Sequence, residues 1–434
     1  MYVHPKYPIY QSKLTVLLSW EEIEEQIINN YTDVKHININ NNDNKDNIDI
    51  DDIVKRYINK YNKMSKNDLK ETLKYLFTNY KEFLYFSIRD GKINGKFQIY
   101  NRISTNNWYK TLKTSDNSNF YDFFNKAKRE LHGEKIKFEP PYKWYANNCI
   151  VRMENWSDSS GLSKSYVSDF LEMIEITTKT YNVPDCDIII NRKDFPFLTT
   201  DGSYSYYSLY DKNAKNDQPK NCWTVCSQST RDNNLDIAVP SADEWNFLKN
   251  INKLNIIDKW EDKINIGVWR GSTTGCGVDI NNNIRLKLAD ISYRWKKENL
   301  NLIDVGIVQF VKGFKVNDMK ISYLNPKLIK FPKAQFLTFD QQSKYKYIFN
   351  LEGNVAAYRL GSLFYMNSVV INIESSHKMW FESLLKHKKH YIQIKNNFEE
   401  DKIKKVITKL RENDDAAKSA GICQEHVCRG PTFL

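Results

Sequence analysis

YKYIFNLEGNVAAYRLGSLFYMNSVVINI, residues 345–373, is the stretch that decides the fold class of this chain. It opens with a short, largely apolar run from Tyr345 to Leu351 and closes with another from Ser368 to Ile373. Such runs are typical of buried parallel strands. Between them, Asn354 to Met366 has the apolar spacing of a helix. The stretch therefore predicts a strand, a helix and a second strand.

The same alternation extends to both sides of this stretch. Further strands are predicted at Ile264–Trp269, Leu302–Phe310 and His390–Ile394, and further helices at Asn283–Trp295, Ser376–Lys386 and Glu399–Asn413. Strands and helices that alternate with short links indicate a doubly wound parallel sheet. We expect this α/β arrangement throughout the second half of the chain.

The first half has weaker periodicity. A helix is predicted at Lys66–Thr78, a hairpin with strands Phe83–Ile88 and Phe97–Ile99 turning at Asp90-Gly91, a helix at Ser165–Tyr181, and a buried parallel strand at Cys186–Ile190. The Asn/Asp-rich run from His36 to Asp52 has too few apolar residues to offset the entropy of ordering it. We expect that run to be a mobile insert.

Composition limits the class of protein. With 434 residues and 41% hydrophobic residues, the chain suits two domains and excludes global disorder. It has no run of about 18 apolar residues and no recognisable signal segment, so we expect a cytoplasmic protein without a membrane span. A net charge of +11 favours polyanionic or phosphorylated ligands without choosing between them.

Trp269 to Gly277 (WRGSTTGCG) forms a glycine-rich turn after a predicted strand. Small residues let backbone N–H groups close around an anion, and the Ser and Thr hydroxyls add donors. The turn lacks the Lys-Ser/Thr pair of a nucleotide-hydrolase phosphate loop. A plain tight turn is an equally good interpretation of these residues alone.

A second turn contains Gly353, Asn354 and Arg359. Gly353 permits a sharp strand-to-helix turn, and Asn354 is a favourable N-cap. The first N–H groups of the helix would then point into the crevice at the carboxyl ends of the strands, where open α/β sheets bind ligands. Arg359 would add positive charge for a diphosphate. The alternative is a surface arginine on an ordinary capped helix.

A third motif, Asn191-Arg192-Lys193-Asp194-Phe195-Pro196, follows the strand at Cys186–Ile190. A carboxylate at Asp194, past the end of a buried strand, is placed to accept a proton from a hydroxyl group. The alternative is a loop aspartate that bonds to its own backbone before Pro196.

The sequence offers little support for a metal site. Asp49-Ile50-Asp51 lies in the Asn/Asp-rich run, and Asp185-Cys186-Asp187 precedes its strand, whereas a metal-binding pair should follow one. Cys222, Cys226, Cys423 and Cys428 have looser spacing than a zinc ribbon. We expect no bound metal and reduced thiols.

In combination and in order, these motifs resemble the family-90 glycosyltransferases, which include Rumi-type protein O-glucosyltransferases, capsule-associated xylosyltransferases and lipopolysaccharide-modifying enzymes. The similarity runs from about Lys81 to about Ala420 and is densest from Lys344 to Arg359. It also includes Arg270-Gly271-Ser272 with Arg285 downstream, the segment around Asp194, and Asp236-Ile237-Ala238-Val239-Pro240.

The resemblance implies a GT-B-like fold, in which two Rossmann-like domains face a cleft, and inverting, metal-independent transfer from a UDP-sugar. It implies that Asp194 is the catalytic base. The positions that it places at the UDP-sugar are Val239, Gly271, Ser272, Arg285, Asn354, Val355, Ala356, Ala357, Tyr358 and Arg359.

The domain boundaries follow from the same resemblance. We predict an N-terminal extension with the low-complexity insert (1–75), an acceptor-side α/β domain carrying the base (76–245), a UDP-sugar-binding Rossmann-like domain (246–395) and C-terminal helices (396–434). The expected partners are a UDP-sugar, with glucose or xylose, and a protein or glycan acceptor.

Two alternatives stay open. One is a catalytically inactive glycosyltransferase-like protein that binds a nucleotide sugar or a glycan. The other is a nucleic-acid binder driven by the charge of +11. The chain lacks a recognition element for nucleic acid, so we expect no nucleic-acid partner.

Overall fold

A computed structural model describes residues 68, 71, 72, 75, 76, 83–101, 149–152, 165–200, 218–223, 225–256, 259–311, 314–317, 320–419 and 421. The chain divides into two compact units. The first comprises Met1–Lys193, Phe197–Ser203 and Ala214–Ser227, and the second comprises Asp194–Pro196, Tyr204–Asn213 and Gln228–Leu434. The run His36–Asp52 and the cysteines Cys423 and Cys428 lie outside the described residues.

The first unit contains the predicted hairpin. Strands β1 (Phe83–Arg89) and β2 (Lys92–Asn101) are antiparallel, with Phe83 opposite Ile99. Asp90 and Gly91 turn the chain with φ values of 50° and 67°. Positive φ at both central residues matches the twist of the flanking strands, which confirms the Asp-Gly turn as a hairpin signal. Strand β3 (Cys149–Arg152) adds to the other side of β2.

Strand β4 (Cys186–Asn191) follows helix α5 (Ser165–Thr180), as expected. The prediction of a parallel strand holds for only one of its two neighbours. Strand β4 is parallel to β5 (Val225–Ser227) but antiparallel to β1. These strands lie in the order β3-β2-β1-β4-β5. The described part of this unit is therefore a mixed, mostly antiparallel sheet and not a doubly wound one. A short apolar run shows that a strand is buried but not which way its neighbours run.

The second unit contains the predicted parallel sheet. Its strands are β7 (Ile264–Ser272), β8 (Ile303–Gln309), β11 (Tyr345–Asn350), β12 (Val369–Ile373) and β13 (Ile392–Ile394). They lie in the order β13-β12-β11-β7-β8, and all neighbouring pairs are parallel. The chain builds outward from β7 to β8 and then crosses back to β11. The order thus reverses between β7 and β11, and such a switch point is where doubly wound sheets bind ligands.

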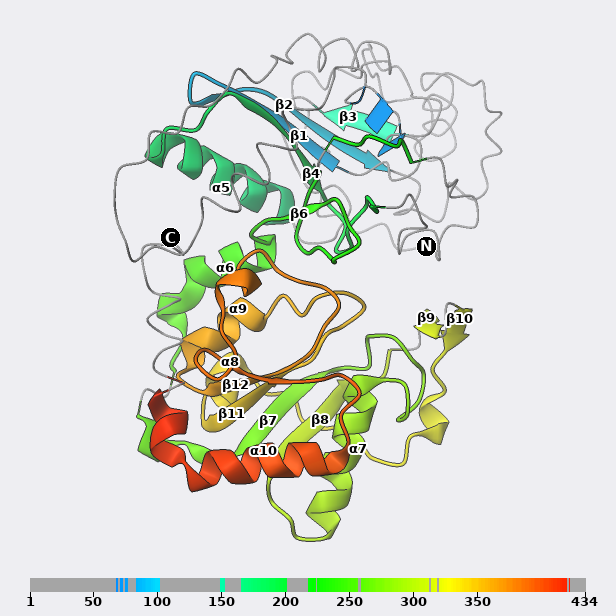
Figure 1. Ribbon diagram of the computed structural model, residues 1–434, viewed down its shortest axis with the longest axis vertical. Coiled ribbons are helices and arrows are strands. Elements are labelled where there is room, and N and C mark those ends of the chain that lie inside the picture. The colour runs from blue at the N-terminus through cyan, green and yellow to red at the C-terminus, as the bar shows by residue number, and fades with distance from the viewer. Residues whose placement is uncertain are drawn as a thin grey trace, which may run out of the picture. The chain divides into compact units, whose positions relative to one another are not determined.

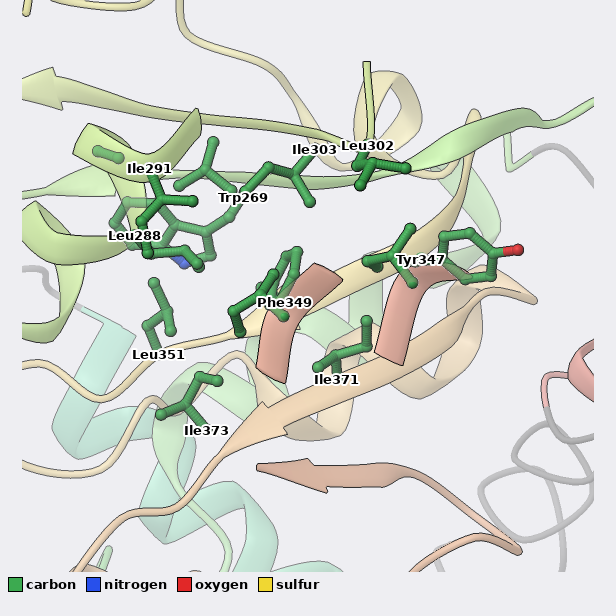
Figure 2. Close-up of a cluster of buried hydrophobic side chains, with 14 of the residues drawn as sticks. Trp269, Leu288, Ile291, Leu302, Ile303, Tyr347, Phe349, Leu351, Ile371 and Ile373 are labelled. Atoms are coloured by element: carbon green, nitrogen blue, oxygen red, sulfur yellow. The ribbon is translucent and has the colours of Figure 1, made fainter. Parts of the chain in front are cut away.

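Helices α7 (Ile284–Lys297) and α10 (Glu400–Glu412) lie along one face of this sheet (Figure 1). Between them and the strands is a core built from alternate strand residues and apolar residues of the helices. Figure 2 shows part of this core, with Trp269, Leu288, Ile291, Leu302, Ile303, Tyr347, Phe349, Leu351, Ile371 and Ile373 labelled. Burial of these side chains is the main stabilising contribution to this unit, at about 1.5–3 kcal/mol for each large apolar residue.

The opposite face of the sheet is covered by shorter elements. The intervening strand residues Val268, Ile348 and Val370 pack there against residues of α9 (Leu360–Leu363) and the 3₁₀ turn Phe364–Met366. Because side chains alternate along a strand, apolar residues at consecutive strand positions indicate a sheet covered on both faces. The prediction from continuous apolar runs is confirmed here.

The remaining elements are short. They are β6 (Ile237–Ala238), α6 (Ala242–Asn250), β9 (Phe314–Asn317), β10 (Lys320–Tyr323), α8 (Phe339–Gln342) and the 3₁₀ turns Ile251–Lys253, Trp260–Asp262, Pro326–Leu328 and Glu382–Leu384. None of the described helices is long and apolar enough to cross a membrane.

Two helix predictions are wrong: one helix begins later than expected, and the other does not form. The helix expected from Asn354 begins only at Leu360, because the Asn354 side chain accepts a hydrogen bond from Gly275 instead of capping the residues that follow it. The helix expected at Ser376–Lys386 is a loop with one 3₁₀ turn. There, Lys378 exchanges backbone hydrogen bonds with Thr230 in an antiparallel bridge, which requires extended backbone.

Candidate active site

The carboxyl ends of β7 and β11 contain two of the predicted motifs. Strand β7 ends at Ser272 and leads into the glycine-rich turn, and β11 leads through Leu351 and Glu352 into Gly353. Because β7 and β11 are adjacent and parallel, both turns emerge at the same edge of the sheet. This edge is the switch point of the second unit, so the topology brings together motifs that lie about 80 residues apart in the sequence.

Glycines shape the turn after β7. Gly271 packs so closely against the Trp269 indole that a β-carbon there would lie 2.5 Å from a ring carbon. Gly277 has φ of 84°, and a β-carbon on it would lie 2.1 Å from the carbonyl oxygen of Asn282. Glycine is therefore required at Gly277 by both conformation and space. This turn therefore has a specific conformation, and its glycines cannot be replaced freely.

The two turns are tied together by Asn354. Its Oδ1 accepts a hydrogen bond of 2.9 Å from the backbone N–H of Gly275. Within the described part of the chain, none of the backbone N–H groups from Asn354 to Arg359 donates a hydrogen bond to the protein. Buried or half-buried N–H groups normally find an acceptor. This run of unused donors is suited to an anionic ligand.

Arg285 joins the ends of the two strands. Its Nε donates to the carbonyl oxygen of Glu352 at 2.7 Å, Nη2 donates to that of Leu351 at 3.0 Å, and Nη1 donates to that of Ser272 at 3.0 Å. Nη1 also donates to the hydroxyl of Thr274. Four of the five guanidinium hydrogens are thus used within the protein. The side chain holds the two turns in a fixed relation.

Positive charge is concentrated at this edge. Burial, with the nearby Arg359, lowers the pKa of Arg285 to about 9, and burial also lowers the pKa of Arg359. The guanidinium carbons of Arg285 and Arg359 lie 5.2 and 5.9 Å from the ring centroid of Trp269. Arg359 Nη1 donates to the carbonyl oxygen of Arg270. Two partly desolvated cations beside one ring favour the arrival of an anion.

The other predicted donor-side residues lie nearby or at the next element. Ser272 is half-buried at the end of β7, and its carbonyl oxygen is held by Arg285. Val355 and Ala356 are buried, and Ala357 is half-buried. Val239 is half-buried and lies two residues before Ser241, the N-cap of α6. No hydrogen bond links Val239 to the two turns in the described part of the chain.

Asp194 groups with the second unit, although the flanking strand β4 belongs to the first. Its side chain is exposed. Its carbonyl oxygen accepts hydrogen bonds from the Tyr358 hydroxyl and from Ser229 Oγ, the latter at 3.3 Å. The predicted base and the turn at Asn354–Arg359 are therefore directly connected through Tyr358.

Sequence reasoning missed a polar cluster beside these turns. Ser375 Oγ donates to Glu352 Oε2 at 2.6 Å, and His377 Nδ1 lies 4.0 Å from the same oxygen. His377 is 6% exposed, and its Nε2 has no hydrogen-bond partner. In the sequence, only the position of Glu352 directly before Gly353 pointed to this cluster. The N-cap Asn283, which accepts from the N–H groups of Arg285 and Leu286, was detectable as an Asn before a helical run.

No group of three or more His, Cys, Asp or Glu side chains among the described residues is arranged to hold a metal ion. The charge at this edge comes instead from guanidinium groups and backbone N–H groups. The chemistry open to this arrangement is the binding of an anion next to an exposed carboxylate.

Comparison with known proteins identifies one family and several relatives. The profile of glycosyl transferase family 90 matches residues 166–427. The "Uncharacterized protein 035R" of Invertebrate iridescent virus 3 is 30% identical over 361 residues, which cover 77% of this chain and 32% of the viral protein. "O-glucosyltransferase rumi" of Drosophila pseudoobscura pseudoobscura is 25% identical over 260 residues, 58% of this chain and 56% of the fly protein.

A shorter match has higher identity. "Protein O-glucosyltransferase 3" of Mus musculus is 36% identical over 134 residues, 31% of this chain and 23% of the mouse protein. The chain spans about a third of the length of the viral relative and about half that of the fly protein.

Proposed function

The chain belongs to glycosyl transferase family 90, and from this premise we propose that it transfers glucose or xylose from a UDP-sugar to a hydroxyl group of a protein or glycan. The observation that carries the proposal is the meeting of Arg285, Arg359 and the unused N–H groups from Asn354 to Arg359 at the switch point of the sheet. The names of the fly and mouse relatives support glucose as the first sugar to test.

The proposed chemistry follows from charge. Breaking the bond between the anomeric carbon and the diphosphate places negative charge on the leaving group. The unused N–H groups and Arg359 would stabilise that charge, while Arg285 holds the two turns that present them. Donors fixed in advance cost no reorganisation during the reaction. A divalent metal is then not required, and we propose metal-independent transfer.

Asp194 would act as the base. An exposed carboxylate can reach the hydroxyl group of an acceptor, remove its proton as the oxygen attacks, and so direct attack to the face opposite the diphosphate. That geometry inverts the anomeric centre. A positioned base contributes about 10²–10⁴-fold to the rate.

We also propose the GT-B arrangement for the two units. The doubly wound sheet of the second unit and the family membership support it. A crystal structure with UDP tests it: nucleotide bound at the edge formed by β7 and β11 and facing the first unit is expected, and nucleotide on any other surface contradicts it.

The test of the reaction is release of UDP from UDP-glucose and UDP-xylose, with water as the acceptor. Asp194→Asn should keep the affinity for UDP and lose at least 100-fold in kcat. EDTA should leave kcat unchanged. An Asp194→Asn variant with the kcat of the wild type would remove the base assignment, and a chelator effect reversed by manganese would remove metal independence. UDP binding with no turnover of either sugar would favour the inactive binding protein instead.

A further inference from the structure

Tyr358 makes an unexpected connection within the second unit. It belongs to the turn of residues 354–359, yet its hydroxyl donates to the backbone carbonyl oxygen of Asp194, 164 positions away. Ser229 Oγ lies 3.3 Å from the same carbonyl oxygen and 3.3 Å from the Tyr358 hydroxyl. The three groups form a triangle: both hydroxyl hydrogens go to the carbonyl oxygen, whose two lone pairs accept both donors, and the two hydroxyl oxygens are in contact without a third hydrogen bond.

The triangle holds the backbone of Asp194 and leaves its carboxylate free. The Asp194 side chain is exposed, while Pro196, two residues on, is buried. Burial raises the pKa of the Tyr358 hydroxyl, so this group stays protonated and stays a donor at any physiological pH. The chain here is anchored through its main chain, and its reactive group remains accessible.

We propose that Tyr358 and Ser229 are positioning residues that fix the catalytic base relative to the donor-binding turn. The proposal rests on the function proposed above, in which Asp194 is the base. Residues 354–359 would then serve twice: their N–H groups face the diphosphate, and the Tyr358 side chain sets the place of the carboxylate.

The physical reason lies in the sensitivity of proton transfer to distance. A shift of about 1 Å in a reacting group can cost about 100-fold in rate. An exposed loop carboxylate without a fixed main chain would sample many positions. A hydrogen bond from the donor turn itself ties the position of the base to the element that holds the leaving group.

Tyr358→Phe is the primary test, because it removes one hydroxyl and keeps the ring. Tyr347→Phe is the matched control: it removes a hydroxyl that donates to Asn265 at 2.8 Å between β11 and β7. The readouts are amide hydrogen exchange of the peptide covering residues 191–198, the Kd for UDP, and kcat and KM for UDP release from UDP-glucose.

In Tyr358→Phe we expect exchange in residues 191–198 to be roughly fivefold faster or more, as the loss of one net hydrogen bond would give. We expect kcat to fall about 10- to 100-fold, with Kd for UDP and KM within twofold of the wild type. Ser229→Ala should show the same pattern with smaller changes, and Tyr347→Phe should show neither change.

Unchanged exchange in residues 191–198 of Tyr358→Phe would overturn the proposal, with or without measurable turnover. A fall in UDP affinity equal to the fall in kcat/KM would also overturn it, since Tyr358 would then be a donor contact. The results distinguish a failure of the positioning role from a failure of the base assignment. An inactive Asp194→Asn with a fully active Tyr358→Phe sinks only the positioning role, whereas an active Asp194→Asn sinks the base assignment itself.

Discussion

Replacing Arg285 by lysine tests whether one guanidinium holds together the two turns that follow β7 and β11. The substitution keeps the positive charge and most of the apolar stem, but it exchanges a planar fork for a single ammonium group. Arg285 now donates to three backbone carbonyl oxygens, of Ser272, Leu351 and Glu352, and to the hydroxyl of Thr274. These acceptors surround the fork on several sides, so one nitrogen cannot reach all of them.

The expected loss of stability follows from the number of hydrogen-bond acceptors that lose their donor. A lysine at this position should leave about two of the four acceptors without a partner, because its three N–H donors share one nitrogen, whereas Arg285 reaches the acceptors from three nitrogens. Each buried acceptor without a partner costs about 1–3 kcal/mol. Two such acceptors give a loss of about 2–6 kcal/mol in the free energy of unfolding. The affinity for UDP should fall as well, because the turns are no longer held in place.

The assay is urea unfolding together with UDP titration, and Arg294→Lys is the control. Arg294 lies on the same helix α7, is 43% exposed, and pairs with Asp290 and Glu400. Exposed ion pairs contribute little, so this control should lose less than about 1 kcal/mol. Equal unfolding midpoints for the two variants, or wild-type UDP affinity in Arg285→Lys, would refute the reasoning.

Two further predictions concern stability. Burial raises the pKa of Glu244, the capping-box residue of α6 that accepts from Ser241, to about 7 from 4.5. The folded state thus favours the protonated form of Glu244, so the free energy of unfolding should fall by on the order of 3 kcal/mol as pH rises from about 4.5 to 7. The melting temperature of Glu244→Gln should change less with pH over this range than that of the wild type. Equal changes in the two proteins would contradict the prediction. Gly277→Ala should lower the melting temperature by at least several degrees, because of its φ of 84° and the 2.1 Å approach of Asn282; an unchanged melting temperature would show that the loop relaxes freely.

Much of the second unit could be predicted from local pattern. The apolar runs that form β7, β8, β11, β12 and β13 are continuous because both faces of the sheet are covered, and their spacing by helical segments implies parallel strands. The Asp90-Gly91 hairpin was equally readable, since positive φ at two successive residues is a local property. Burial and backbone conformation can be recognised from the residue types in a short stretch of sequence.

The contacts that define the candidate site cannot be recognised in this way. Asn354 has the local features of a helix N-cap, but its side chain bonds to Gly275, so the helix begins at Leu360. The family resemblance places Arg285 at the UDP-sugar, but only its bond to the carbonyl oxygen of Glu352, 67 positions away, shows that it joins the two turns. The same resemblance places Tyr358 at the UDP-sugar, and only the structure shows that its hydroxyl donates to the carbonyl oxygen of Asp194. Local propensity is a weak preference, and a few hydrogen bonds between distant segments outweigh it; which segments meet is settled only when the whole chain has packed.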